Sequence, residues 1–358
     1  MHHLTPPSNV IAAWFPGDST IKPVPFGDGH INSTFFFKSQ GGEFIIQKIN
    51  KNVFHHPDEV MHNISRVSEF LEKKDYAYKI LKPLPTKQGQ YFFIADEEYW
   101  RVFPFIAHTR AVSRVETVQQ AKEGARAFGQ FAHALKDLST ENIYYTIPVF
   151  HNYQKRYEDF IEAVDKDAAG RLPDLLAEVD RMKELYPLIG DVLSVIAPIP
   201  RRVIHSDTKI SNVLIDEKTN QGVSVIDLDT LMPGYLFYDY SDMVRSFTNT
   251  ADEDEKDIDQ VKMSWDIFEA LTRGYLETLG PSLSDAEWLS LEKGVAVVTY
   301  IQVLRFLADY LNGDIYYKID YPDHNLNRTR NQIKLLESIL GYKQQINELL
   351  KEIRSSGS

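Results

Sequence analysis

Cysteine is absent from this sequence of 358 residues. Disulfide bonds, thiolate metal sites and a cysteine nucleophile are therefore excluded. An excess of positive charge is also absent, because 39 lysine and arginine residues stand against 51 aspartate and glutamate residues and give a net charge of −12. Binding to nucleic acid or to an anionic membrane needs a basic surface, so the charge argues against both partners. It does not exclude one bound nucleotide, since magnesium and a few local donors can offset the overall field.

Two further features are missing from the chain. No apolar run is long enough to span a bilayer, and the N-terminus lacks the basic segment and apolar core of a signal peptide. Cysteine-free chemistry is also compatible with the cytosol. We therefore expect a cytoplasmic protein without a signal peptide, and the sequence implies no protein partner.

The residues that are present predict a packed protein with two lobes. Hydrophobic residues make up 43% of the chain and aromatic residues 12%, and 358 residues exceed the size at which a single core usually stops growing. Before Pro104 the pattern is mostly that of strands, with one helix at 57–73. The predicted strands, of which the first two form a hairpin, lie at 34–37, 44–49, 91–95 and 99–103.

After Pro104 the pattern changes to long helices, except at 201–228, where short apolar runs alternate with turns. The predicted helices lie at 116–137, 151–165, 173–193, 256–278, 284–312 and 323–353. We therefore predict an α+β, bilobal protein-kinase-like fold, with a small antiparallel-sheet lobe at 1–103 and a larger, mainly helical lobe at 104–358. The linker between them is predicted at 103–106.

The most informative motif lies in that exceptional region. Residues 203–216 have the form His-x-Asp-x-x-x-x-Asn with apolar flanks, and a second apolar run leads into Asp227. A kinase-type phosphoryl transferase needs a base for the acceptor hydroxyl and oxygen ligands for magnesium. Asp207 is the candidate base, and Asn212 and Asp227 are the candidate magnesium ligands. The alternative is a loop of Asx turns and a turn cap. Each half of the motif alone favours that alternative, whereas both halves in this order favour the transferase.

Three neighbouring features fit the same chemistry. Lys209, two residues after the base, can offset charge on the transferred phosphoryl group, and an exposed lysine is the alternative. Gly27 and Gly29 form a Gly-x-Gly turn that can fold over nucleotide phosphates, and an ordinary hairpin turn is the alternative. The linker, with Phe103 and Phe105, is expected to offer backbone groups to adenine.

Segments along almost the whole chain carry a family resemblance. They are 27–34, 205–212, 226–234, 254–257, 305–316 and 321–330. The block that contains Asp207 and Asp227 resembles the aminoglycoside phosphotransferase and choline kinase superfamily, and the segments together are most similar to the N-acetylhexosamine 1-kinases. That family transfers the γ-phosphoryl group of ATP to the anomeric hydroxyl of N-acetylglucosamine or N-acetylgalactosamine and forms the sugar 1-phosphate. The resemblance implies the same function here, with Mg²⁺ as the cofactor and with ATP and a small sugar as ligands.

The resemblance also implies roles for individual residues. The implied contacts with the substrate are His30, Asn32, Asp207, Arg305 and Tyr316, with Asp309 and Tyr317 as further candidates. His205 is implied to brace the loop instead of acting as a base, and Asp242 to fix the loop from behind. Arg305 and Asp309 are four residues apart and share a helix face. An exposed ion pair is the alternative to a pair that faces the sugar.

Two positions are left open by the sequence. Kinase-like proteins carry a phosphate-binding lysine on the third strand, where this chain has Gln47 followed by Lys48. Because side chains alternate along a strand, only one of the two can face the cleft. Asp229 either supports the metal ligands or caps a turn.

Two other functions are compatible with these patterns. One is a kinase of the same fold that acts on another small alcohol, such as choline, homoserine, methylthioribose or an aminoglycoside. An arginine at the acceptor, as Arg305 would be, disfavours a cationic acceptor and suits a neutral sugar. The other is a non-catalytic, pseudokinase-like binding module, for which the only support is Gln47 in place of lysine.

Overall fold

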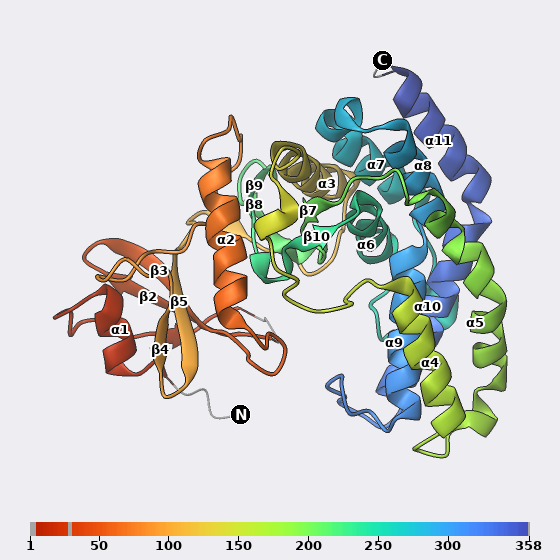
Figure 1. Cartoon of the computed structure of the whole chain (residues 1–358), viewed down its shortest axis with the longest axis horizontal. Coiled ribbons are helices and arrows are strands. Elements are labelled where there is room, and N and C mark those ends of the chain that lie inside the picture. The colour runs from red at the N-terminus through yellow and green to blue at the C-terminus, as the bar shows by residue number, and fades with distance from the viewer. Residues whose placement is uncertain (1–4, 28–30, 357–358) are drawn as a thin grey trace.

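The predicted hairpin lies in the middle of a five-stranded antiparallel sheet with the order β1-β2-β3-β5-β4 (Figure 1). The structure is a computed structural model that describes residues 5–27 and 31–356. The strands are β1 (Val24–Pro25), β2 (Ser33–Ser39), β3 (Gly42–Lys48), β4 (Phe93–Ala95) and β5 (Glu98–Pro104). All four predicted strands are thus confirmed, with small shifts at their ends.

The two faces of this sheet have different partners because side chains alternate along each strand. One face buries Ile46 and Val102, which pair across β3 and β5, under the short helix α1 (Ser8–Trp14). The sequence analysis did not predict α1. The other face carries the next cross-strand pair, Gln47 and Arg101, and points toward the C-terminal part of the chain.

Helix α2 (Pro57–Leu71) lies between the sheet and the helical part of the chain (Figure 1). Pro57 occupies its first turn, and Asp58 in the same turn interacts favourably with the helix dipole. Val60 and Ile64 are buried in the large core that continues into the C-terminal part. This helix therefore joins the sheet to the rest of the molecule through apolar packing.

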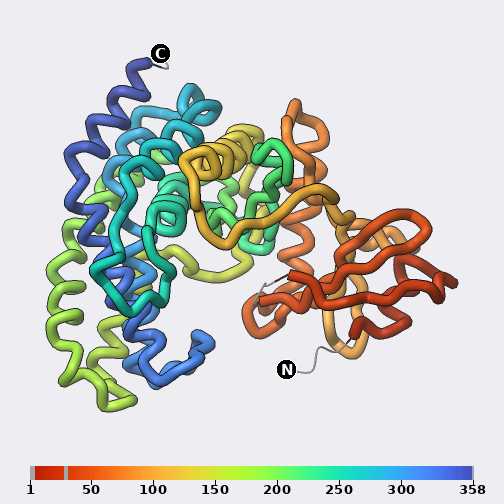
Figure 2. The backbone as a smooth tube through the Cα atoms, turned by 180° about the vertical axis from the view of Figure 1, so that it is seen from behind, coloured from red at the N-terminus to blue at the C-terminus, as the bar shows by residue number. Residues whose placement is uncertain are grey.

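The remainder of the chain is mainly helical, as predicted, and α11 lies on the side farthest from the sheet (Figures 1 and 2). The helices are α3 (Val118–Ala134), α4 (Tyr153–Lys166), α5 (Leu176–Ile189), α6 (Leu236–Thr248), α7 (Trp265–Leu279), α8 (Asp285–Gly294), α9 (Val297–Leu311), α10 (His324–Gly341) and α11 (Lys343–Ser356). Short 3₁₀ helices lie between these elements: η1 (Thr140–Asn142), η2 (Leu172–Asp174), η3 (Gly190–Val195), η4 (Ile210–Asn212), η5 (Leu228–Thr230), η6 (Ile258–Gln260) and η7 (Gly280–Ser282).

The exceptional region at 201–228 does form short strands and turns. The strands of the C-terminal part are β6 (Thr109–Arg110), β7 (Arg202–Ile204), β8 (Val213–Asp216), β9 (Gly222–Val225) and β10 (Met232–Gly234). They form one pair, β10-β7, and one three-stranded sheet, β6-β8-β9. The predicted boundary between the lobes at 103/104 falls at the last two residues of strand β5, and the division into lobes stays a prediction.

Several predicted helices are wrong in extent. The segment 284–312 consists of two helices, α8 and α9, bent by 42°. The hydroxyl of Ser241 satisfies the backbone at this break, since it donates to the carbonyl of Val295 and accepts the N–H of Val298, both at 2.9 Å. No single helix among those described is both long enough and apolar enough to span a membrane. The bent pair of α8 and α9 meets the length and composition only when the two helices are taken together.

Two other predicted helices are divided, and one begins late. The segment 323–353 is divided at Tyr342, and α5 ends at Ile189 and continues as the 3₁₀ segment η3. The helix predicted from residue 256 begins only at Trp265, because the preceding backbone is extended and Met263 forms a β-bridge with Asn249. Helix α6 was not predicted, and most of its residues are buried, including the polar Asp239, Ser241 and Asp242.

Candidate active site

The loop that carries Asp207 is fixed from behind by helix α6. The carboxylate of Asp239 accepts the backbone N–H groups of His205 and Ser206 at 2.9 and 2.8 Å. Ser206 has a φ of +68°, and the surrounding hydrogen bonds hold this unfavourable backbone conformation. Burial raises the pKa of Asp239 to about 6. The sequence analysis did not identify this role of Asp239, although a carboxylate in an apolar segment was the available signal.

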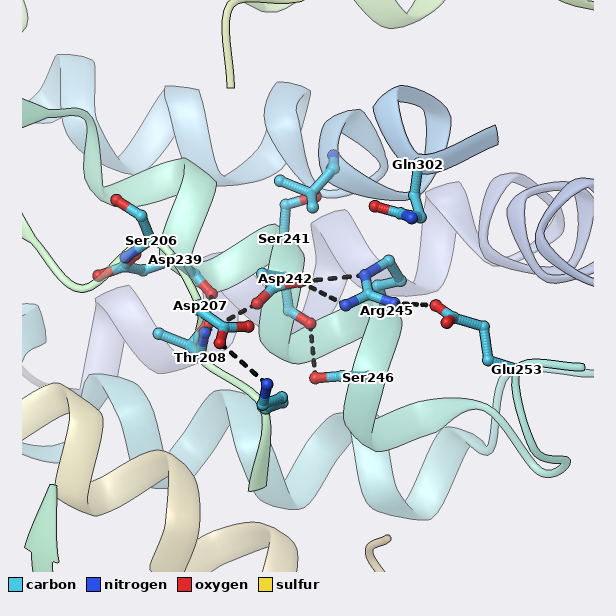
Figure 3. Close-up of polar contacts among 12 residues, drawn as sticks. Ser206, Asp207, Thr208, Asp239, Ser241, Asp242, Arg245, Ser246, Glu253 and Gln302 are labelled. Atoms are coloured by element: carbon cyan, nitrogen blue, oxygen red, sulfur yellow. Dashed lines mark hydrogen bonds and ion pairs between the residues drawn. The ribbon is translucent and has the colours of Figure 1, made fainter. Parts of the chain in front are cut away.

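A second carboxylate of α6 fixes the other side of the loop (Figure 3). Asp242 accepts the N–H of Thr208 at 2.8 Å. Arg245 donates to Asp242 from Nε and Nη2 at 3.0 and 2.9 Å, and it also contacts Glu253 at 2.8 Å. The structure therefore places Asp242 behind the loop, as the resemblance implied.

Asp207 lies at the front of this loop with one carboxylate oxygen already engaged. Its Oδ2 accepts hydrogen bonds from Lys209 Nζ and from Asn212 Nδ2, both at 3.0 Å. Burial raises the pKa of this carboxyl, but the charge of Lys209 and the hydrogen bonds from Lys209 and Asn212 outweigh burial and lower the pKa to about 2. Asp207 is therefore ionised at neutral pH and can accept a proton. Its charge in turn raises the pKa of Lys209.

His205 uses both ring nitrogens within the protein. Its Nε2 donates to the carbonyl of Ile226 at 2.9 Å, and its Nδ1 accepts the N–H of Asp207 at 3.3 Å. The ring packs edge-on against Phe128, with 5.3 Å between the centroids. This arrangement agrees with a bracing role for His205 and leaves Asp207 as the base candidate.

The candidate metal ligands lie at the same end of the antiparallel pair β8-β9, since Asn212 directly precedes β8 and Asp227 follows β9. The N–H of Ile226 donates to the carbonyl of Asn212 at 2.9 Å, which brings the end of β9 against the loop. The Asn212 amide nitrogen is used by Asp207, so its oxygen is left to bind a cation. Burial, followed by the charges of Asp229 and Asp207, raises the pKa of Asp227 to about 7.

These donors fit magnesium. Amide and carboxylate oxygens are the ligands it prefers, and a divalent cation would relieve the repulsion among the carboxylates that raises the pKa of Asp227. Within residues 5–27 and 31–356, no group of three or more histidine, aspartate or glutamate side chains is arranged to hold a metal by itself. Magnesium held by one or two protein groups usually takes its other ligands from substrate phosphates and water.

Asp229 forms an ion pair with Arg101 of β5, which settles the position that the sequence left open. The contacts are Arg101 Nη1 to Oδ1 at 2.6 Å and Nη2 to Oδ2 at 2.9 Å. Asn32 Nδ2 also donates to Oδ2 at 2.7 Å, and its Oδ1 accepts the N–H of Asn50 at 3.0 Å. Asn32 therefore lies beside the turn at 227–230, which follows β9 and is called the metal turn below because it carries the candidate ligand Asp227. The predicted contact of Asn32 with substrate stays a prediction.

On strand β3, Gln47 faces the buried pair of Arg101 and Asp229, and Lys48 does not. Gln47 Oε1 accepts Arg101 Nε at 3.0 Å, and its amide donates to Thr34 Oγ1 at 3.0 Å. Lys48 lies on the other side of the strand, 3.5 Å from Glu98. The position at which kinase-like proteins carry a lysine is thus occupied by the neutral Gln47. Its cross-strand neighbour Arg101 is a buried cation on the same face.

Aromatic rings line the region predicted for the nucleotide. The ring of Phe105, just after β5, packs against Phe26 and Phe36, with centroids 5.6 and 5.0 Å apart. Phe103 is buried beneath the Arg101 guanidinium. Gly27 has a φ of +75° that suits glycine, whereas Gly29 and His30 lie outside the described residues. The predicted nucleotide contacts of Gly27, Phe103 and Phe105 stay predictions.

Arg305, in the middle of α9, lies in an aromatic cluster. Its guanidinium is 5.3 Å from the ring centroid of Phe150, 5.6 Å from Tyr316 and 5.4 Å from Tyr317. Arg305 Nη2 also lies 3.4 Å from the hydroxyl of Tyr316, a ring that is 63% exposed. The structure therefore brings together Arg305 and Tyr316, two of the predicted sugar contacts.

Asp309 has a different role from the one considered for it. Its buried carboxylate accepts the backbone N–H groups of Ile315, Tyr316 and Tyr317 at 2.8 to 3.0 Å, and Asn325 Nδ2 at 2.9 Å. It holds the loop that carries the two tyrosines, whereas the guanidinium of Arg305 contacts Gln302 and Tyr316. The interpretation of these two residues as a pair is therefore wrong.

His151 connects the cluster of Arg305 to the loop of Asp207. Its Nε2 donates to the carbonyl of Ser206 at 2.8 Å, and its ring contacts that of Phe150, with centroids 4.5 Å apart. Phe150 in turn lies under Arg305. The candidate base and the predicted sugar contacts therefore belong to one continuous region. The residues that connect them, His151 and Phe150, were not identified by the sequence analysis.

The sequence profile of the phosphotransferase enzyme family, APH, matches residues 22–267. The match includes Asp207, Asn212 and Asp227 and ends before α9, which carries Arg305.

Solved structures are similar to this chain over almost its whole length. An aminoglycoside phosphotransferase from Alicyclobacillus acidocaldarius has a TM-score of 0.65 at 13% identity, covering 97% of this chain and 96% of its own. A microcompartment-associated aminopropanol kinase has a TM-score of 0.61 at 16% identity, covering 94% and 97%. A spectinomycin phosphotransferase, solved with ADP and spectinomycin, has a TM-score of 0.57 at 14% identity, covering 91% and 93%. Identities this low show the shared fold alone, and the predicted fold class is thereby confirmed.

Proposed function

The chain belongs to the phosphotransferase enzyme family, and within it we propose that the protein transfers the γ-phosphoryl group of ATP to the anomeric hydroxyl of an N-acetylhexosamine. N-Acetylglucosamine and N-acetylgalactosamine are the proposed acceptors, ADP and the sugar 1-phosphate are the products, and magnesium is the proposed metal. The observation that carries the proposal is the ionised carboxylate of Asp207, fixed between Lys209 and Asn212.

In the proposed step, Asp207 takes the proton of the attacking hydroxyl while the sugar oxygen bonds to the γ-phosphorus. The bond from this phosphorus to the bridging oxygen breaks, and ADP leaves with the electron pair. A carboxyl with a pKa of about 2 is a weak base. The reaction asks little of it, because the transition state is loose and an anomeric hydroxyl is more acidic than an ordinary alcohol.

The other residues of the site position groups and offset charge. Lys209 lies 3.0 Å from Asp207, where its ammonium can interact with the transferred phosphoryl group. Asn212 and Asp227 would hold magnesium, which would neutralise charge on the nucleotide phosphates. Asp239 and Asp242 keep the loop in place before substrate arrives, so little reorganisation is needed during the reaction.

The charge near Arg305 supports a neutral acceptor. Arg156 lies close enough that burial, followed by the charge of Arg305, lowers its pKa. Two guanidinium groups repel an ammonium group, which disfavours an amino alcohol or an aminoglycoside as the acceptor. A sugar instead offers hydroxyl oxygens to Arg305 and an apolar ring face to the exposed ring of Tyr316. The choice of an N-acetylated hexosamine rests on the sequence resemblance.

The test is a coupled ADP-release assay with Mg²⁺-ATP and a panel of acceptors. The panel contains N-acetylglucosamine, N-acetylgalactosamine, glucose, galactose, choline, homoserine and kanamycin, and Asp207→Asn is the control. We expect turnover on the two N-acetylhexosamines and none above background with the variant. Turnover only on choline, homoserine or kanamycin would contradict the proposed acceptor. A lack of turnover on every acceptor would contradict the proposed activity and favour a non-catalytic, pseudokinase-like binding protein.

A further inference from the structure

A buried ion pair connects the N-terminal sheet to the turn that follows the candidate metal ligand. Arg101 lies on β5 and Asp229 in η5, 128 residues later, and each side chain is only 2% exposed. The pair is bidentate, so it fixes the orientation of both groups as well as their separation. Asp229 is two residues from Asp227.

The protein holds the guanidinium of Arg101 on three sides. Its Nε donates to Gln47, whose own amide is oriented by the hydroxyl of Thr34. The ring of Phe103 lies beneath it at 5.1 Å, and its two terminal nitrogens bind Asp229. In protein kinases the corresponding ion pair joins a lysine of the third strand to a glutamate of the neighbouring helix. In this chain the pair joins the sheet directly to the metal turn.

Both oxygens of Asp229 are already engaged by the protein. Oδ1 accepts from Arg101, and Oδ2 accepts from Arg101 and from Asn32. Asp229 is therefore fully satisfied as an ion-pair partner, and Asp227 is left as the carboxylate of this turn for the cation. The backbone of Asp227 has a φ of +58°, an unfavourable conformation that its neighbours must maintain.

We propose that Arg101 is a positioning residue for the metal site: by holding Asp229 it keeps the turn in the conformation that presents Asp227 to a nucleotide-bound cation. The inference rests on the proposed function, because it needs a nucleotide and a metal in this cleft. It adds that the sheet and the proposed metal site are linked through one side chain, since Arg101 lies on β5 and binds Asp229.

The test measures metal binding directly, with Mn²⁺ as the probe. Free Mn²⁺ is followed by electron paramagnetic resonance in the presence of ADP, for the wild type, Arg101→Lys, Asp229→Asn and the double variant. Loss of a residue that orients a metal ligand typically costs about 10- to 100-fold in affinity, and we expect this change in each single variant. The double variant should be no weaker than the weaker single variant, because the two residues act as a unit.

The chain offers a matched control for the loss of a buried ion pair. Arg202 and Glu287 also form a bidentate pair, at 2.7 and 3.0 Å, with side chains 11% and 2% exposed. Arg202→Lys should lower the melting temperature and leave Mn²⁺-ADP affinity within about twofold of the wild type. If Arg101→Lys does not fold, Gln47→Leu removes one contact of Arg101 and should weaken Mn²⁺ binding in the same direction by a smaller factor.

The outcomes separate this inference from the proposed function. A folded Arg101→Lys protein with wild-type Mn²⁺-ADP affinity would overturn the inference, as would an equal loss in Arg202→Lys. A wild-type protein that binds no Mn²⁺-ADP would overturn both proposals. A wild-type protein that binds it tightly but phosphorylates no N-acetylhexosamine would remove the proposed acceptor, while a selective loss in Arg101→Lys would still support the positioning role.

Discussion

The side-chain amide of Asn212 donates to the carboxylate and to the backbone carbonyl of Asp207, at 3.0 and 2.8 Å. The candidate base and a candidate metal ligand are thus bonded to each other before any ligand binds. Because Nδ2 of Asn212 is used in these hydrogen bonds, its Oδ1 is the atom left for a cation. Oδ2 of Asp207 is likewise engaged by the protein.

Replacing Asp207 by asparagine tests the base directly. The variant keeps the size of the side chain and removes the acceptor of the proton, so kcat should fall by about 100- to 10,000-fold with little change in the melting temperature. Steady-state kinetics and a circular-dichroism melt measure the two quantities. Asp216→Asn, which changes the carboxylate at the last residue of β8, is the control and should keep wild-type kcat. Wild-type turnover by Asp207→Asn would remove Asp207 from the chemistry.

Replacing Asp227 by alanine tests the metal ligand. The change removes the carboxylate that the structure leaves for the cation, so ATP binding should lose its dependence on Mg²⁺. Isothermal titration calorimetry with and without Mg²⁺ measures this dependence. Binding that strengthens with Mg²⁺ as much as in the wild type would show that the cation is held elsewhere.

Replacing Arg305 by alanine tests the acceptor end of the site. Because Arg305 lies with Tyr316 and away from the metal turn, the Michaelis constant for the sugar should rise at least about tenfold, the loss of a charged hydrogen bond, with that for ATP nearly unchanged. Arg181→Ala is the control, since Arg181 forms exposed ion pairs with Glu184 and Glu337. Equal increases in both Michaelis constants would move Arg305 out of the sugar site.

His151 makes the fold sensitive to acid. Burial lowers its pKa to about 4, against about 6.5 in an unfolded chain. Between these values the unfolded chain binds more protons than the folded one, so the free energy of unfolding falls as pH falls, and the contribution is complete above about pH 6.5. The full effect is at most about 3 kcal/mol.

A variant isolates this contribution from that of other groups. Asp239, whose pKa burial raises to about 6, contributes with the opposite sign over the same range, but it is present in both proteins. Denaturant unfolding at pH 7 and pH 4.5 should therefore show a smaller loss of stability in His151→Gln, which can still donate to Ser206, than in the wild type. Equal losses would exclude His151 as a source of acid sensitivity.

Local patterns in the sequence predicted the strands of the sheet and the loop that carries Asp207. The hairpin was visible because turn residues and alternation act over a few residues, and the pattern around Asp207 was visible because its spacing is fixed. The role of Arg101 was not predicted, because its partner Asp229 is 128 residues away. A single arginine between buried residues of strand β5 was the available signal. Asp309 was misinterpreted for a related reason, since helical spacing shows a shared face but not which backbone groups lie opposite.

The most direct test of the proposed function is the phosphorus NMR spectrum of a reaction of the wild-type protein with Mg²⁺-ATP and N-acetylglucosamine. The proposal predicts equal formation of ADP and of one phosphomonoester, whose phosphorus is coupled to the anomeric proton of the sugar. A phosphomonoester coupled to the protons at C6, or ATP that remains unchanged while the protein is folded, would contradict the assignment of this chain as a sugar 1-kinase.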